Sequence, residues 1–197
     1  MLNSINLSSK DIRRLLQAVR ERLHLSGFEI ALIIVGGANL NVMNIVARTT
    51  KDVDVIAQTE GEGDELTIRS PLPFPEPLTQ AIETVARDFN ISSDWMNAEV
   101  AAQWNVGMPD TILDDLTWRK YSALKVGFAG RQTIISLKLF AAADRSPASV
   151  HAQDLVALRP TDDELLHAAD WVKTQDASEH FSSLVDDVIR YVKRDRE

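Results

Sequence analysis

The sequence predicts an α/β (α+β) fold, in which helices flank a small mixed sheet and a helical bundle forms the C-terminal part. Three observations support this class. The β-branched apolar run at 31–35 is long enough for one buried strand. Apolar residues recur at helical spacing on both sides of this run, at 12–23 and 78–89. Two more amphipathic stretches close the chain, so we expect an αβ core at 1–145 and a helical region packed on it at 146–197.

The composition allows a proper hydrophobic core, because the chain has 197 residues and 45% apolar side chains. No apolar run reaches the ~18 residues of a membrane span, and residues 1–10 do not resemble a secretory signal. The absence of cysteine excludes disulfides and thiolate metal sites, and makes the cytoplasm the expected location. The net charge of -8 argues against sequence-independent DNA binding.

The order of elements follows from caps and periodicity. Ser8 or Ser9 caps the first helix, with Asp11 as the capping-box partner of Ser8, and Gly27 ends that helix. A second capping box begins a helix at Thr161. The patterns predict strands at 31–35, 52–56, 65–70 and 121–128, and further helices at 38–46, 78–89, 131–143 and 177–193.

A candidate site lies where the strand at 31–35 ends. Gly36 and Gly37 follow it, and paired glycines let backbone turn sharply and approach a ligand closely. In the next strand, Asp52 and Asp54 alternate with valines, so both carboxylates share one face, about 7 Å apart. Because Mg²⁺ takes few protein carboxylates and completes its shell with water and phosphates, the pair is a candidate magnesium site. The alternative is a simple turn with solvent-facing acids.

This arrangement resembles the nucleotidyltransferase superfamily, whose members carry a Gly-Gly or Gly-Ser turn, a helix and a D-x-D strand. The string Arg48-x-Thr50-x-Asp52-x-Asp54 is similar to a subgroup of small bacterial proteins that includes the AbiEii-type toxins. The resemblance implies Mg²⁺ as cofactor, a nucleoside triphosphate as substrate, an RNA or protein acceptor and an antitoxin-like partner. It also implies that Arg48 and Thr50 assist nucleotide binding.

The C-terminal half carries a second part of the resemblance. Family members have a leucine-lysine-leucine helix followed by an acid-leucine pair, here Leu137-Lys138-Leu139 and Asp154-Leu155. The resemblance implies that Lys138 neutralises a nucleotide phosphate and that Asp154 orients it or assists the acceptor hydroxyl. A lysine in an apolar helix needs an anionic partner, which is a phosphate or Asp154, unless its ammonium extends to water.

The sequence departs from the superfamily at the third carboxylate that many active members supply from a later strand. The predicted strand at 121–128 has Lys125 and no acid. Trp95-Met96-Asn97 looks like a variant of a tryptophan-leucine-asparagine element of the subgroup; the alternative is a capped helix start with a packed Trp95. Three functions therefore stay open: a nucleotidyltransferase-like enzyme, a catalytically inactive nucleotide-binding module, and a protein-interaction module.

Overall fold

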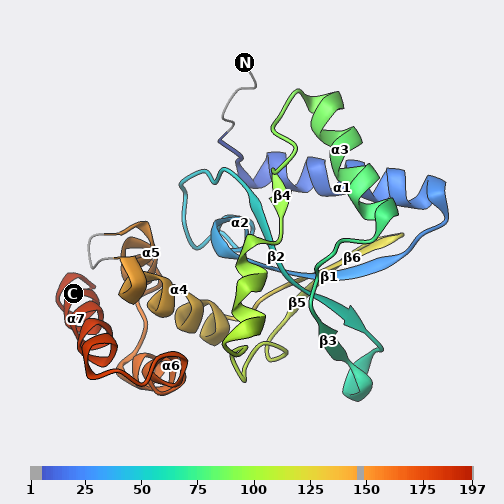
Figure 1. Ribbon diagram of the computed structural model, residues 1–197. Coiled ribbons are helices and arrows are strands. Elements are labelled where there is room, and N and C mark those ends of the chain that lie inside the picture. Colours follow the sequence, from blue (N-terminus) through green and yellow to red (C-terminus); the bar gives the residue numbers. More distant parts are fainter. Residues whose placement is uncertain (1–5, 146–148, 197) are drawn as a thin grey trace. The chain divides into compact units, whose positions relative to one another are not determined.

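The computed structural model describes residues 6–145 and 149–196 (Figure 1). Its contacts divide the chain into two compact units. The first unit comprises residues 1–105 and 116–128, and the second comprises 106–115 and 129–197. The predicted class is confirmed, because the chain combines a mixed six-stranded sheet with flanking helices and a C-terminal helical part. The contacts place the helix at 131–145 in the second unit, together with the later helices. The boundary predicted from the sequence had left this helix in the αβ core at 1–145.

The sheet lies in the first unit and has the strand order β3-β2-β1-β6-β5, with β4 paired to β2 beside this path. The β1–β6 and β2–β4 pairs are parallel and the other pairs are antiparallel, so the sheet is mixed. The strands are β1 (Ile30–Val35), β2 (Val53–Glu60), β3 (Thr67–Arg69), β4 (Met96–Asn97), β5 (Thr117–Tyr121) and β6 (Leu124–Phe128).

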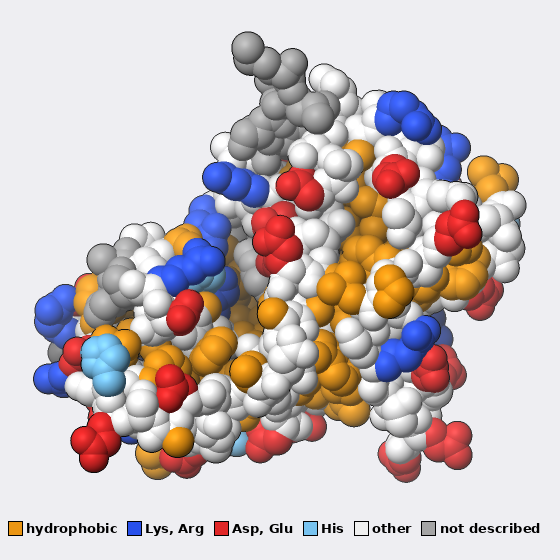
Figure 2. All heavy atoms as spheres, viewed as in Figure 1, with side chains coloured by type: hydrophobic (Ala, Val, Ile, Leu, Met, Phe, Trp, Pro, Cys, Tyr) orange, Lys and Arg blue, Asp and Glu red, His pale blue; other side chains and the backbone are white. Residues whose placement is uncertain are grey.

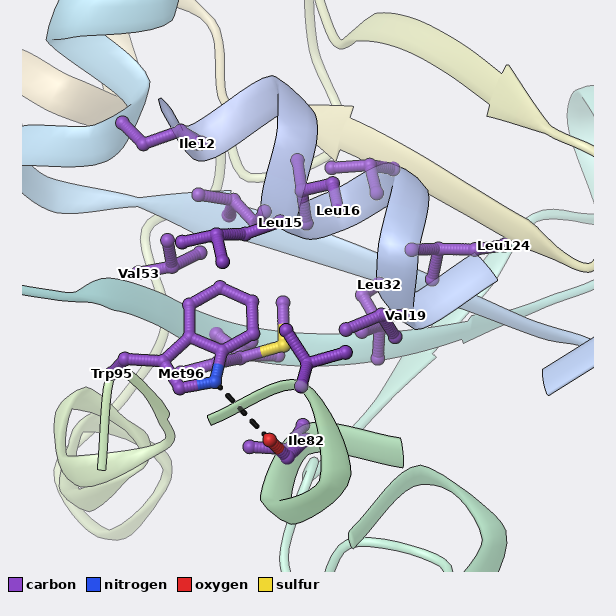
Figure 3. Close-up of a cluster of buried hydrophobic side chains, with 14 of the residues drawn as sticks. Ile12, Leu15, Leu16, Val19, Leu32, Val53, Ile82, Trp95, Met96 and Leu124 are labelled. Atoms are coloured by element: carbon purple, nitrogen blue, oxygen red, sulfur yellow. Dashed lines mark hydrogen bonds between the residues drawn. The ribbon is translucent and has the colours of Figure 1, made fainter. Parts of the chain in front are cut away.

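Two helices, α1 (Ser9–Ser26) and α3 (Glu76–Phe89), cover one face of this sheet (Figure 1). Both capping contacts predicted for α1 are present, between Ser8 and Asp11. The cluster of buried side chains beneath the helices is hydrophobic, and Trp95 brings an indole N–H into it (Figure 3). Trp95 is 2% exposed and donates that N–H to the Ile82 carbonyl at 3.3 Å, so it packs without leaving a buried donor unpaired.

A β-bulge interrupts the antiparallel pairing of β1 and β2. Ile33 pairs with Ala57 and Ile34 pairs with Val55, which leaves Ile56 as an extra residue. The Ile56 carbonyl instead accepts a 2.7 Å hydrogen bond from the Trp104 indole, in the short helix η2 (Glu99–Asn105). The bulged backbone is therefore stabilised by a side chain from a distant part of the first unit.

Replacing Trp104 with phenylalanine tests this role. The phenyl ring retains much of the packing but cannot donate to Ile56, which is fully buried. We expect the free energy of unfolding to fall by about 1–3 kcal/mol, the cost of an unsatisfied buried acceptor. Urea unfolding followed by circular dichroism measures the loss. Trp118→Phe is the matched control, because no hydrogen bond of its indole is seen among the described residues, and an equal loss there would contradict the explanation.

Several predicted elements need correction. The predicted strand at 121–128 is confirmed at 124–128, where β6 lies, but its start is wrong: Ser122, at φ 52°, lies in the turn between β5 and β6. The predicted helix at 38–46 is the shorter α2 (Gly36–Val42), ended by a left-handed residue at Asn44. Asp52 lies just before β2 rather than within it, and β2 extends to Glu60, beyond the predicted strand end at 56.

The second unit is helical. Its helices are α4 (Arg131–Arg145), α5 (Val150–Leu158), α6 (Asp162–Gln175) and α7 (Glu179–Asp195). The predicted capping box at Thr161 is confirmed, with Glu164 as its partner. The Phe140 ring of α4 makes edge-to-face contacts with Trp171 and Phe181, which join α4 to α6 and α7.

Two properties of the chain concern its helices and its surface. Across residues 6–145 and 149–196, none of the helices combines the length and the apolar character that a membrane span requires. Acidic side chains are spread over the visible face of the molecule (Figure 2), as a net charge of -8 suggests.

Candidate functional site

The glycine pair lies where β1 ends and α2 begins. Gly36 has φ +72°, a conformation that side chains other than glycine rarely adopt. A Cβ atom at this residue would lie 2.0 Å from Asp54 Oδ2, so the Asp54 carboxylate occupies the space beside the glycine backbone. Since Val35 pairs with Asp54 in the ladder, the strand register holds the two elements together. The glycine turn and the second aspartate therefore form one packed unit.

Gly37 brings the next two predicted residues into the same place. A Cβ atom there would lie 2.7 Å from Thr50 Oγ1 and 3.8 Å from Arg48 Nη1. The Thr50 hydroxyl lies 3.4 Å from both the main-chain oxygen and the Oδ1 atom of Asp52, and donates to one of them. Thr50 thus connects the glycine turn to the first aspartate.

The two aspartates differ in environment from the neighbouring valines, Val53 and Val55. Val53 and Val55 are fully buried in the core under α1 and α3, whereas Asp52 and Asp54 are half-buried. Strand alternation directs Asp54 to the face opposite these valines. Neither carboxylate lies within the apolar core, and an aqueous ligand is therefore compatible with the pair.

Two asparagines of α2 support this site, and neither was singled out from the sequence. Asn41 is buried, and its side-chain amide donates to the Arg48 carbonyl at 2.5 Å. Asn39 is also buried and donates to the Ile34 carbonyl at 3.3 Å. The sequence feature that could have revealed them is a pair of polar residues within a short apolar helix. A buried amide requires hydrogen-bond partners, so these two side chains are expected to bond to nearby backbone.

Asn97 lies beside Asp54 in the parallel pair of β2 and β4. Its amide donates to the Asp94 carbonyl at 3.2 Å, and its Oδ1 accepts from the Glu99 backbone N–H at 2.9 Å. These bonds shape the turn that leads into η2. The packed Trp95 of the structural alternative is confirmed, whereas its helix start is wrong, because residues 96 and 97 form β4.

Magnesium fits the pair better than a metal that needs several protein ligands. Within the described part of the chain, no group of three or more His, Cys, Asp or Glu residues could hold an ion. Mg²⁺ commonly binds through one or two carboxylates together with water and substrate phosphates. Asp52 and Asp54 supply that number, and the remaining positions suit a phosphate ligand.

Lys138 and Asp154 form a separate pair in the second unit. The ammonium of Lys138, on α4, lies 2.7 Å from Asp154 Oδ2, on α5. The two side chains are 7% and 2% exposed, so the pair is buried. Asp154 is therefore confirmed as a counter-charge of Lys138. The alternative prediction, that the Lys138 ammonium extends to water, is wrong. The placement of this pair beside Asp52 and Asp54 stays a prediction.

Gly36→Ala tests the close packing against Asp54. We expect a loss of stability about 1–3 kcal/mol larger than for Gly27→Ala, together with weaker Mg²⁺-dependent nucleotide binding. Gly27 is the matched control, because its φ of +68° imposes similar strain but nothing lies within 4 Å of its added Cβ. Urea unfolding and calorimetric titration measure both effects. Equal losses in the two variants would show that the Asp54 contact is unimportant.

The first unit thus brings together the predicted residues Gly36, Gly37, Arg48, Thr50, Asp52 and Asp54. Comparison with known proteins adds no relative: no family model, curated protein or solved structure matches this chain.

Proposed function

We propose that this chain is a Mg²⁺-dependent nucleotidyltransferase-like protein, which transfers a nucleoside monophosphate from a nucleoside triphosphate to an RNA or protein acceptor. The observation that supports the proposal most strongly is the packing of Asp54 Oδ2 into the space beside Gly36. It places a carboxylate next to backbone that can approach a phosphate closely. A cytoplasmic location and an antitoxin-like partner belong to the same proposal.

Each residue of the first unit has a role in this proposal. Asp52 and Asp54 would hold the metal, which would supply positive charge to offset the negative charge that develops during displacement. The backbone amides at Gly36 and Gly37 would approach the triphosphate, and the exposed Arg48 would assist from the loop. Thr50 would position Asp52 through its hydroxyl.

The reaction itself is a displacement at phosphorus. An acceptor hydroxyl oxygen would bond to the α-phosphorus while the bond from the α-phosphorus to the bridging oxygen breaks. Pyrophosphate would leave with that oxygen, and the hydroxyl proton would pass to water. Positioning and electrostatic stabilisation would supply most of the catalysis, as in other phosphoryl transfers.

Lys138 would neutralise a nucleotide phosphate. Its bond to Asp154 engages one of three ammonium N–H donors, so the pair fixes the ammonium while donors are left for a phosphate. Asp154 is 2% exposed, which favours the positioning role over direct contact with an acceptor hydroxyl.

Isothermal titration with ATP, GTP, CTP and UTP, with and without Mg²⁺, tests the proposal. We expect at least one nucleotide to bind, and to bind more tightly with Mg²⁺. A nucleoside without phosphates should bind far more weakly. If no nucleotide binds under either condition, the protein-interaction module becomes the better description.

A catalytically inactive nucleotide-binding module is the second candidate, because no third acid joins the aspartate pair among the described residues. Incubation with labelled nucleotides and total cellular RNA or protein separates the two candidates. Transfer of label with release of pyrophosphate supports the enzyme, whereas nucleotide binding without any transfer supports the inactive module.

A further inference from the structure

A pocket lies in the first unit, where β1 and β2 separate. Their ladder ends at the Leu32–Gln58 pair, although β1 continues back to Ile30 and β2 continues to Glu60. A cavity of about 500 Å³ opens there, which is within the range of small-molecule sites. We call it the Thr59 pocket; its walls include Ala31, Gln58, Thr59, Lys120, Ser122 and Lys125.

The Thr59 pocket is distinct from the aspartate site. Thr59 lies five residues after Asp54 on β2, or about 16 Å at the usual rise of a strand. A ligand of ribose-phosphate size in the pocket would therefore not contact the Asp54 carboxylate. The inference does not rest on the proposed function.

One buried oxygen on the lysine side of the pocket wall lacks a partner. Thr59 Oγ1 makes no hydrogen bond among the described residues, although Thr59 is only 8% exposed. Leaving a buried polar atom unpaired is unfavourable, so such atoms in proteins usually meet water or a ligand. The Thr59 hydroxyl indicates a ligand that carries hydroxyl or amino groups.

Two lysines lie together in a lining that also includes Arg69 and the acids Glu29, Glu60 and Glu62. Lys125 pairs with Ala31 on β1 and with Lys120 on β5, so both lysines share one sheet face. Thr59 lies on that face too, because it follows Gln58, which pairs with Leu32 on the opposite face. The Lys125 ammonium also lies 4.3 Å from the centroid of the Trp118 ring, which helps to hold it in place.

The two ammonium groups are incompletely neutralised. Both approach the same atom, Glu62 Oε1, at 4.0 Å for Lys120 and 3.4 Å for Lys125. These distances exceed the 2.7–2.9 Å that is typical of a strong charge-assisted hydrogen bond. The Glu62 side chain is 76% exposed, and exposed ion pairs contribute little stability. The weakly held Glu62 carboxylate therefore occupies a position in which a dianion could neutralise both Lys120 and Lys125.

We propose that the Thr59 pocket binds a small phosphate monoester that carries hydroxyl groups. The phosphate displaces the Glu62 carboxylate and binds between Lys120 and Lys125, and a ligand hydroxyl bonds to Thr59 Oγ1. A dianionic phosphate neutralises two ammonium groups, whereas a single carboxylate such as Glu62 neutralises one. The three phosphate oxygens also offer enough acceptors for both lysines.

Calorimetric titration with ribose 5-phosphate, ribose and inorganic phosphate tests the proposal. The full chain is used with EDTA, so that the magnesium-dependent site does not contribute. We expect ribose 5-phosphate to bind more tightly than either of the other two probes. Equal binding of ribose would overturn the phosphate contact, equal binding of inorganic phosphate would overturn the hydroxyl contact, and no binding at millimolar concentration would overturn the whole proposal.

Three variants locate the binding. Lys120→Ala, at a side chain that is 73% exposed, should weaken ribose 5-phosphate about tenfold, as expected for one charge-assisted hydrogen bond. Glu62→Gln should strengthen binding, because the competing charge is removed. Thr59→Val should weaken binding yet leave Tm equal or higher, because it removes an unpaired buried hydroxyl.

Matched controls separate this pocket from the rest of the molecule. Lys173→Ala removes a surface lysine that is paired with Asp186, and Asp54→Asn alters the aspartate site. Neither should change the affinity for ribose 5-phosphate. If Lys120→Ala has no more effect than Lys173→Ala, or if Glu62→Gln weakens binding, the assignment of the phosphate to this pocket is wrong.

Discussion

Lys138→Ala is expected to lower the free energy of unfolding by about 3–5 kcal/mol, the usual cost of removing one member of a buried ion pair. The substitution would leave the Asp154 carboxylate, which is 2% exposed, without the ammonium that lies 2.7 Å from it. A charge buried without its partner is strongly unfavourable. Urea unfolding of the variant and the parent protein gives the difference directly.

Two further variants define what that result means. Lys173→Ala breaks the surface pair with Asp186 and should cost only about 0–1 kcal/mol. Lys138→Met combined with Asp154→Leu removes both charges and should recover most of the lost stability. If Lys138 also contacts a nucleotide phosphate, the double variant recovers stability but not nucleotide affinity. A loss below about 1 kcal/mol for Lys138→Ala would contradict the buried-pair description.

Asp54→Asn should abolish Mg²⁺-dependent nucleotide binding, and with it any transfer activity. The carboxamide keeps the shape of the side chain, so the contact with Gly36 is retained while the charge for the metal is lost. We expect the affinity for the Mg²⁺–nucleotide complex to fall about 100-fold, since metal binding here depends on two carboxylates. Titration with and without Mg²⁺ measures the change.

Stability should distinguish a metal ligand from a structural residue. Removing one of two neighbouring carboxylates relieves like-charge repulsion in the metal-free protein, so Tm should be unchanged or higher. A loss of several kcal/mol would instead show that Asp54 is a structural hydrogen-bonding partner. Asp64→Asn, at an exposed acid outside the pair, should change neither the nucleotide affinity nor Tm.

Local chemistry explains which elements could be predicted from the sequence. The capping boxes at Ser8 and Thr161 were readable because the cap and its partner lie three residues apart. The turn of the β5–β6 hairpin was missed. Ser122 takes a left-handed conformation there, and the residue usually found in that conformation is glycine or asparagine. Helix α5 was missed as well, since its nine residues are few for a helical period to stand out.

The candidate site was partly predictable for a similar reason. Residues 36–54 are close in sequence, so the glycine turn and the aspartates could be recognised as one motif, and their packing follows from the pairing of β1 with β2. The Lys138–Asp154 pair was anticipated from the cost of burying a lysine in an apolar helix. The Thr59 pocket could not be anticipated, because its walls come from several strands and its opening depends on where two of them part.

The extra residue at Ile56 interrupts the alternation of side chains along β2. On a regular strand, residues an odd number apart, such as Asp54 and Thr59, would project from opposite sides. The bulge absorbs one residue, and both side chains project from the same side. Deleting Ile56 would leave Asp54 and Thr59 four residues apart, so a regular strand would still carry both on that side. The bulge therefore accommodates an inserted residue while the aspartate site and the Thr59 pocket keep one surface of the sheet.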